Sequence, residues 1–168
     1  MTLYTTVESP IGATLLVGDV VAGHIALTGT YLGGQRYERA IGADWERDDV
    51  ALGDAREQLM AYFAGTSTSF ELPISFDGSD FQRKVWQALL DIPYGTTCTY
   101  GELAARVADR SKTRAVAAAV GRNPVGVIVP CHRVIGADGS LTGYAGGLDR
   151  KRWLLDHEAR VAGLTLAL

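Results

Sequence analysis

A cysteine and a histidine stand side by side in the segment PCHRV, residues 130–134, directly after an apolar run at 125–129. A thiol attacks as its thiolate, which is scarce at neutral pH for a cysteine of ordinary pKa, about 8.5. A neighbouring base such as His132 can remove the thiol proton, and a third group commonly fixes the tautomer of that base. The pair therefore predicts nucleophilic chemistry at Cys131.

Glu158 is the candidate for the third group. It lies in a segment, 149–160, that we expect to be helical, because Leu154, Glu158 and Val161 recur at the spacing of one helix face. A carboxylate on an apolar face needs a partner. The alternative interpretation is that the cysteine and the histidine are ordinary core residues and the carboxylate is solvated, which is the commoner fate of an isolated Cys-His pair.

Several motifs in the second half of the chain extend this hypothesis. They are Tyr94-Gly95, Thr99-Tyr100, Arg114-Ala115-Val116, Asn123-Pro124, the segment 130–134, Gly143-Tyr144 with Gly146-Gly147, and the segment 154–158. In the order and spacing of these motifs, the region from Asp80 to Glu158 resembles the O6-alkylguanine-DNA alkyltransferases, also called methylated-DNA–protein-cysteine methyltransferases. The first 80 residues resemble the family more loosely, mainly at 9–12 and 62–65.

The resemblance implies direct-reversal DNA repair, in which the alkyl group of an O6-alkylguanine passes irreversibly to Cys131, once per chain, from a base flipped out of the duplex. O4-alkylthymine stays open as a second substrate. His132 would act as the base, through a water molecule, and Glu158 would orient it. Tyr100 would donate a hydrogen bond to N3 of the guanine, and Asn123 would brace the active-site turn. Core packing for Tyr100 and a simple helix end at Asn123 are the alternatives.

The same resemblance assigns a guanine-binding set. The carbonyls of Cys131 and Val134 would accept from the exocyclic amine. Tyr144 would form a wall of the pocket, the amide of Ala145 would donate to O6, and Gly146 would let the loop approach the base closely. The family often has serine where this chain has Ala145, so a hydroxyl is missing while the amide is kept.

A helix of small side chains would enter the minor groove. Arg114, at its start, would fill the space left by the flipped nucleotide. Ala115 would let the helix approach the groove wall, Val120 would lie near the extruded base, and Arg122 would add a phosphate contact. For Arg114, an ordinary surface charge or a phosphate contact is the alternative.

Charge is divided unevenly along the 168 residues, whose formal net charge is −3. Residues 1–80 hold four arginines and twelve carboxylates, a net charge of −8, whereas residues 81–168 hold twelve basic side chains and seven carboxylates, a net charge of +5. A basic half that also carries the predicted chemistry fits a phosphate-binding surface, although ordinary surface charge would look the same.

We expect an α/β fold of the α+β type with two domains. Residues 1–78 should form a small N-terminal antiparallel β-sheet with one helix and a connecting segment. The β-prone runs are 3–7, 13–17 and 21–27, and the helix, with Asp54 and Glu57 at its start, should stop near Gly65.

Residues 79–168 should form a mainly helical DNA-binding and active-site domain. Ser79 with Gln82, and Thr99 with Glu102, predict helix N-termini, and Ser111 predicts the start of a further helix that ends near Gly121. The last two of these helices indicate a helix-turn-helix of the winged-helix kind, with an αα-hairpin in a core as the alternative.

Two cysteines and three histidines show no metal-ligand spacing, so we expect reduced thiols, no zinc, no other cofactor and a cytoplasmic protein. No apolar stretch reaches the length of about 18 residues that spans a membrane, which predicts no membrane association. We expect a monomer that binds double-stranded DNA containing O6-alkylguanine, with cooperative binding along DNA left open.

Two other classes of function remain. A cysteine hydrolase would use the same thiol for acyl transfer, but Tyr100, Arg114 and Asn123 would then be unexplained. A noncatalytic protein that binds alkylated DNA and recruits other repair factors shares the expected fold, but such proteins lack the acceptor cysteine that this chain keeps at Cys131.

Overall fold

The computed structural model describes residues 1–163. The chain forms two compact units, one of Met1–Asp77 with Pro124–Ile128, and one of Gly78–Asn123 with the residues from Val129 onward. The sequence-based division near residue 78 did not include the return of Pro124–Ile128 to the first unit. The last five residues of the chain, 164–168, lie outside the part that the structure describes.

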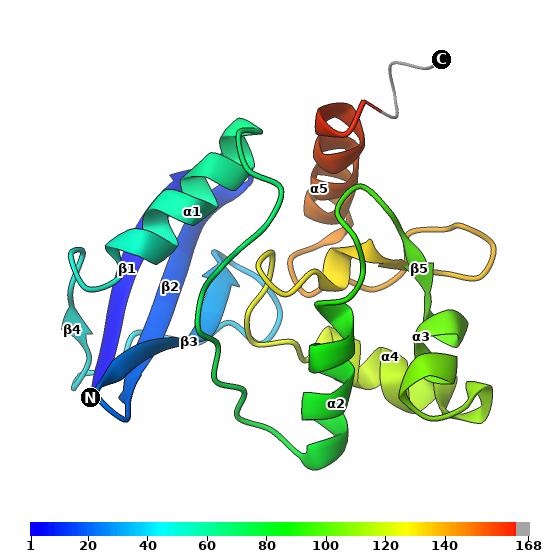
Figure 1. The fold of residues 1–168 in the computed structure, drawn as a ribbon, viewed down its shortest axis with the longest axis horizontal. Coiled ribbons are helices and arrows are strands. Elements are labelled where there is room, and N and C mark those ends of the chain that lie inside the picture. Colours follow the sequence, from blue (N-terminus) through cyan, green and yellow to red (C-terminus); the bar gives the residue numbers. More distant parts are fainter. Residues whose placement is uncertain (164–168) are drawn as a thin grey trace. The chain divides into compact units, whose positions relative to one another are not determined.

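A mixed sheet forms the centre of the first unit. Its strands are β1 (Thr2–Ser9), β2 (Gly12–Val21), β3 (His24–Leu32) and β4 (Glu46–Arg47), in the order β3-β2-β1-β4. The long strands pair antiparallel as expected, whereas β4 pairs parallel with β1 and makes the sheet mixed. Helix α1 (Gly53–Ala64) lies along one face of the sheet (Figure 1).

Period-two burial explains how β1 packs, since Leu3, Thr5 and Val7 are buried between more exposed neighbours. The strand expected at 21–27 begins later, at His24, because Ala22 and Gly23 both have positive φ angles and form a turn. Helix α1 ends at Gly65 in the left-handed conformation, as the sequence predicts.

The start of α1 differs from the sequence prediction. Leu52 is the N-cap and no side chain caps the helix, while Asp54 lies inside the first turn. There its carboxylate accepts a hydrogen bond from Nε2 of Gln58, 3.0 Å away. The Asp54 side chain therefore makes a hydrogen bond within the helix and does not precede it as a cap.

The second unit is mainly helical. Its elements are α2 (Asp80–Leu89), β5 (Cys98–Thr99), α3 (Tyr100–Val107), the 3₁₀ turn η1 (Arg110–Lys112), α4 (Thr113–Gly121), the 3₁₀ turn η2 (Cys131–Arg133), β6 (Val134–Ile135) and α5 (Leu148–Val161). Helices α2, α3 and α4 pack on one another, and Nε1 of Trp86 on α2 donates to the carbonyl of Ala119 on α4 at 2.8 Å.

Side-chain caps define two of these helices as predicted. Ser79 and Gln82 form a reciprocal capping box at α2, and the hydroxyl of Thr99 accepts from the amide of Glu102 at α3. Ser111 does not cap α4. Instead, Asp109 accepts from the amide of Ser111 at the start of η1, because a 3₁₀ turn precedes the helix.

A two-residue parallel pairing positions the site. Strands β5 and β6 pair Cys98 with Val134 and Thr99 with Ile135. This pairing brings the start of α3, and with it Tyr100, next to the strand that leaves the cysteine-containing turn η2.

Candidate active site

The segment 130–134 folds as a buried turn. Cys131, His132 and Arg133 form η2 and are 8 %, 0 % and 7 % exposed. The amide of Cys131 donates to the carbonyl of Val129 at 2.8 Å, and the amide of Val134 closes the turn by donating to the carbonyl of Cys131. The thiol thus lies on a backbone that is hydrogen-bonded on both sides.

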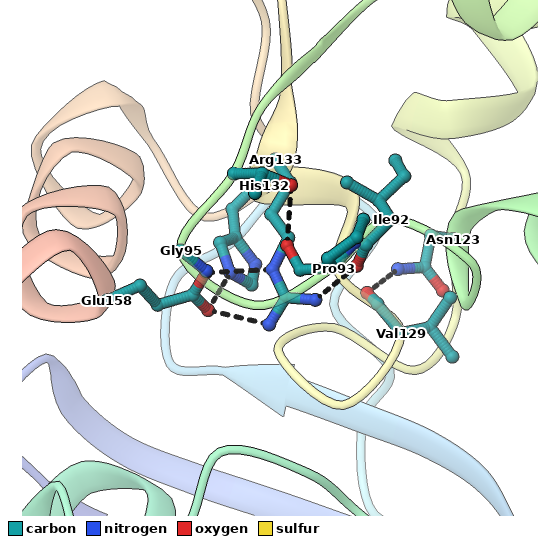
Figure 2. A network of polar contacts seen from close by, with 9 residues as sticks. Ile92, Pro93, Gly95, Asn123, Val129, His132, Arg133 and Glu158 are labelled. Carbon is teal, nitrogen blue, oxygen red and sulfur yellow. Dashed lines mark hydrogen bonds and ion pairs between the residues drawn. The ribbon is translucent and has the colours of Figure 1, made fainter. Parts of the chain in front are cut away.

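Glu158 gathers the polar groups around this turn (Figure 2). Its Oε2 lies 2.7 Å from Nε2 of His132, and the guanidinium of Arg133 donates from Nε to Oε1 at 2.8 Å and from Nη2 to Oε2 at 3.0 Å. The amide of Gly95 donates to Oε1 at 3.4 Å. The structure therefore brings His132 and Glu158 together from segments distant in sequence.

The charges of this pair follow from burial and from Arg133. Burial raises the pKa of Glu158, but the hydrogen bond from His132 and the hydrogen bonds and positive charge of Arg133 outweigh it and hold that pKa well below its usual range. Burial lowers the pKa of His132 more than the carboxylate raises it. At neutral pH the pair is thus an ionised carboxylate and a neutral imidazole.

This charge state fixes the tautomer of His132. An ionised carboxylate only accepts hydrogen bonds, so Nε2 must carry the proton and Nδ1 keeps a lone pair. Among the described residues, Nδ1 of His132 is buried and has no hydrogen-bond partner. Nδ1 can therefore accept a proton, and it belongs to the residue that follows Cys131 in the sequence.

The thiol itself needs such a base. Burial raises the pKa of Cys131, while a hydrogen bond from Asn123 and the charge of Lys151 act in the opposite direction. The resting side chain is therefore the thiol, and a nucleophile forms only when the proton is removed.

Asn123 lies just beyond α4 and is buried. Its Nδ2 donates to the carbonyl of Val129 at 2.8 Å, which ties the end of the helix to the turn-containing segment that leads into Cys131 (Figure 2). This contact is the kind of bracing that the sequence analysis assigned to Asn123.

Tyr100 begins α3, and its hydroxyl donates to the carbonyl of Thr142 at 3.0 Å. Burial raises the pKa of this phenol, and the nearby Cys131 adds to the rise. The hydroxyl is thus a neutral donor close to the thiol. To donate to a guanine N3, it has to leave the Thr142 carbonyl.

The residues assigned to guanine binding lie on β6 and on the loop before α5. Val134 is buried, while Tyr144, Ala145 and Gly146 are half-buried. The carbonyls of Cys131 and Val134 already accept one donor each inside the protein, from the Val134 amide and from Nζ of Lys151. A carbonyl has two lone pairs, so each can still accept from a ligand.

Helix α4 presents a face suited to close approach. Arg114, Ala115, Ala118 and Arg122 are exposed at helical spacing, with alanines between the two arginines. Val120, in contrast, is 4 % exposed and packs inside the unit. The structure therefore does not favour the DNA contact that the sequence analysis assigned to Val120.

Sequence reasoning missed Arg133 and Lys151. Arg133 stands in the reactive segment itself, and a buried arginine needs a carboxylate, which was a usable signal. Lys151 is completely buried on α5, one turn before Leu154 and two before Glu158. Extending the predicted helix face towards the N-terminus would have found it.

Among the residues that the structure describes, no cluster of at least three histidine, cysteine, aspartate or glutamate side chains is arranged to hold a metal ion. Within residues 1–163, no helix has the length and apolar character to cross a membrane.

Comparisons with known proteins indicate one family for this chain. Residues 80–160 match the family model of the 6-O-methylguanine DNA methyltransferase DNA-binding domain, and residues 2–76 match that of the ribonuclease-like domain of the same family. A methylated-DNA–protein-cysteine methyltransferase of Mycolicibacterium paratuberculosis is 48% identical over 166 residues, covering 98% of this chain and 97% of that protein.

Solved structures give the same result. The O6-methylguanine methyltransferase of Mycobacterium tuberculosis superimposes with a TM-score of 0.86 at 46% identity and covers all of both chains. A structure of M. tuberculosis OGT in complex with DNA has the same TM-score and identity, with 98% and 97% of the two chains covered. This chain therefore belongs to the 6-O-methylguanine DNA methyltransferase family.

Proposed function

We propose that this protein repairs alkylated DNA by direct reversal, moving the alkyl group of O6-alkylguanine to Cys131. The partner is double-stranded DNA that contains the lesion, and the protein acts as a monomer. Membership of the family and the DNA complex of its 46% identical relative support DNA as the partner.

The chemistry is a substitution at the alkyl carbon. A water molecule relays the proton of the Cys131 thiol to Nδ1 of His132, and Sγ then forms a bond to that carbon while the bond between the carbon and O6 breaks. The electron pair of the broken bond stays on the guanine, where a hydrogen bond from Tyr100 to N3 offsets the charge. The proton held by His132 then passes to the guanine, so the products are an S-alkylcysteine, a neutral imidazole and an unmodified guanine.

One observation carries this proposal. The ionised Glu158 accepts from Nε2 of His132 at 2.7 Å, which leaves a buried lone pair on Nδ1 of the residue that follows the cysteine. A buried thiol of raised pKa requires a base of this kind. A mere core pair of cysteine and histidine would not need a carboxylate to set the tautomer.

The reaction occurs once per chain. A thioether does not exchange with thiols as a disulfide does, so neither Cys98 nor a cellular thiol regenerates the acceptor. The alkylated base has to leave the base stack of the duplex to reach the buried thiol of this protein. This extrusion costs a few kcal/mol, and less for a poorly paired lesion. A cytoplasmic location would keep both cysteines reduced.

Peptide mass spectrometry tests the function. The protein is mixed with a duplex containing one O6-methylguanine, beside Cys131→Ser as the matched control. We expect one methyl group on Cys131, one restored guanine per chain and no transfer in the control. Binding of the lesion duplex without transfer would leave a lesion-sensing protein as the function and would remove the acceptor role of Cys131. A duplex with O4-methylthymine, run in parallel, decides the second substrate.

A further inference from the structure

Gly101 is an unexpected residue in the helix that begins with Tyr100. It occupies the second position of α3, where glycine favours a helix less than alanine does. Its backbone has no positive φ that would require glycine. A Cβ at this position, however, would lie only 2.7 Å from Nη1 of Arg110 and 3.8 Å from its Cζ. The missing side chain therefore leaves room for the guanidinium of Arg110 against the first turn of the helix.

Arg110 reaches this place from η1, the turn between α3 and α4. On one side, the hydroxyl of Thr113 donates to the carbonyl of Arg110 at 2.6 Å. On the other side, the carboxylate of Asp109 accepts from the amide of Ser111 at 2.8 Å. Because the turn is hydrogen-bonded at both ends, the Arg110 side chain starts from a defined position.

Arg110 forms no ion pair within the described part of the chain. Glu102, the acidic residue in the first turn of α3, does not pair with it. The carboxylate of Asp109 instead accepts from the amide and the hydroxyl of Ser111. A guanidinium that is held against a helix without a carboxylate is placed to bind an anion from outside the protein.

The position of Arg110 also extends the exposed face that we assign to DNA. Arg114, Ala118 and Arg122 follow it at intervals of four residues, and all four positions are exposed. The guanidinium lies against the residue that follows Tyr100, whose hydroxyl we assign to the flipped base. An anion bound there would therefore belong to the DNA backbone near the extruded nucleotide.

We propose that Arg110 binds a backbone phosphate of DNA beside the extruded base, and that the absence of a side chain at Gly101 holds its guanidinium in place for this contact. The parallel N–H groups of a guanidinium match the oxygens of a phosphate, and a side chain that is already held in place loses less conformational freedom on binding. This inference rests on DNA as the partner in the proposed function, but not on methyl transfer.

Binding to an unmodified duplex tests the contact separately from the chemistry. The Kd is measured for the wild type, for Arg110→Gln and for Arg106→Gln, an exposed cation in the last turn of α3. One phosphate contact contributes about 0.9 to the slope of log K against log salt. Arg110→Gln should lose that amount, so its deficit in affinity should shrink about 3.5-fold between about 50 and 200 mM salt. Arg106→Gln should keep the wild-type slope.

Gly101→Ala tests the role of the missing side chain. Alanine favours the helix, so we expect an unchanged or higher urea midpoint, while the added Cβ displaces the guanidinium and weakens duplex binding. The double variant should bind no more weakly than Arg110→Gln, because both changes remove the same contact. If Gly101→Ala weakens binding equally with and without Arg110, DNA approaches the glycine backbone directly and the proposed role of Gly101 is wrong.

Neutral methylphosphonates locate the phosphate. They replace the phosphates around an O6-methylguanine one at a time on both strands, in a Cys131→Ser background that prevents transfer. We expect one position at which the affinity falls with Arg110 present and does not fall in Arg110→Gln. A wild-type salt slope in Arg110→Gln, or the lack of such a position, would overturn the inference and leave the proposed function intact. A wild type that binds no duplex would overturn both.

Discussion

At the scale of single residues, one buried carboxylate organises the reactive centre. Glu158 orients His132 and balances the charge of Arg133, whose Nη1 in turn donates to the carbonyl of Ile92 at 2.7 Å. The guanidinium therefore ties the carboxylate to the segment after α2. A substitution in this unit should affect reactivity and stability together, and the two effects have to be measured separately.

Glu158→Gln should slow methyl transfer at least a hundredfold, the usual contribution of a positioned general base. A glutamine amide can donate to Nε2, so the imidazole no longer has to keep its lone pair on Nδ1. Single-turnover rates and the Kd for lesion duplex measure the effect, with the Kd expected close to wild type. Asp156→Asn, an exposed acid on the same helix, is the control. Equal rates in Glu158→Gln and wild type would remove Glu158 from the mechanism.

Stability should fall as the pH drops below about 6.5, the ordinary pKa of histidine. Burial lowers the pKa of His132 in the folded protein, so the unfolded chain binds a proton first and is favoured at lower pH. The lowered pKa of Glu158 acts in the same direction at still lower pH, where the unfolded carboxylate is protonated first. Urea unfolding between pH 8 and 5 measures this.

The matched variant for that experiment is His132→Gln. It should flatten the dependence of the unfolding free energy on pH between about pH 7.5 and 5.5, because this range brackets the ordinary histidine pKa of about 6.5. His24→Gln, at an exposed position, should not change it. A steep acid loss that persists in His132→Gln would assign the effect to other groups.

At the scale of elements, caps and short pairings set the position of the chemistry. The capping box of α2 and the Thr99 cap of α3 start two helices that pack with α4, and the β5-β6 pairing joins α3 to the cysteine turn. Each of these local features is visible in the sequence as a residue type at a fixed spacing.

Ser79→Ala should lower the free energy of unfolding by about 1 kcal/mol, because the amide of Gln82 loses its acceptor at the start of α2. The transfer rate of the folded protein should not change, since no residue of α2 takes part in the proposed mechanism. Thr68→Ala, at an exposed position outside the helices, serves as the control in urea unfolding. A wild-type unfolding free energy in Ser79→Ala would contradict this prediction.

Arg114→Ala should slow transfer from duplex DNA by roughly ten- to a hundredfold, the size of a base-flipping cost that is no longer offset. Transfer from free O6-methylguanine should keep its rate, because a free base needs no extrusion. Arg106→Ala on α3, also exposed, is the control for lost charge. If Arg114 contacts only a phosphate, the Kd and its salt dependence will change and the saturated rate will not.

At the scale of the whole molecule, the chain passes from one unit to the other more than once along the sequence. Pro124–Ile128 belongs to the first unit, where the amide of Thr30 donates to the carbonyl of Pro124 at 2.9 Å, although Asn123 and Val129 on either side belong to the second. Val127 adopts a positive φ of 69° there, which is unfavourable for a β-branched residue. The boundary is therefore interleaved, not a single linker.

A fragment beginning at Gly78 should fold poorly even though it holds every proposed catalytic residue. Val125, Val127 and Ile128 are 0 %, 1 % and 4 % exposed in the whole chain, and the fragment lacks the rest of the unit to which they belong. We expect low soluble yield and a lower urea midpoint than for the full chain. Replacing the three residues by serine should improve solubility. A stable, cooperatively unfolding fragment would contradict the interleaved boundary.

The sequence alone predicted the parts of this protein that depend on local rules. Helix caps at Ser79 and Thr99, the end of α1 at Gly65 and the helix that carries Glu158 follow from residue types at short spacing. The cysteine segment and its motifs indicated the family, which the comparisons show. The start of α4 was predicted wrongly, which shows the limit of these rules. Residues 110–112 are compatible with both a 3₁₀ turn and an α-helix, so residue types alone do not distinguish the two.

Tertiary structure decided what depends on burial and on distant partners. It brought Arg133 to Glu158, placed Val120 inside the core, and buried Lys151 among carbonyls although its neighbours Arg150 and Arg152 make the segment look like a solvated basic helix. The physical reason is that the protonation state of a side chain depends on its surroundings. Desolvation and the position of a counter-charge decide which imidazole nitrogen carries the proton, and packing decides which cation lies near the thiol. Those surroundings come from residues far apart in the chain.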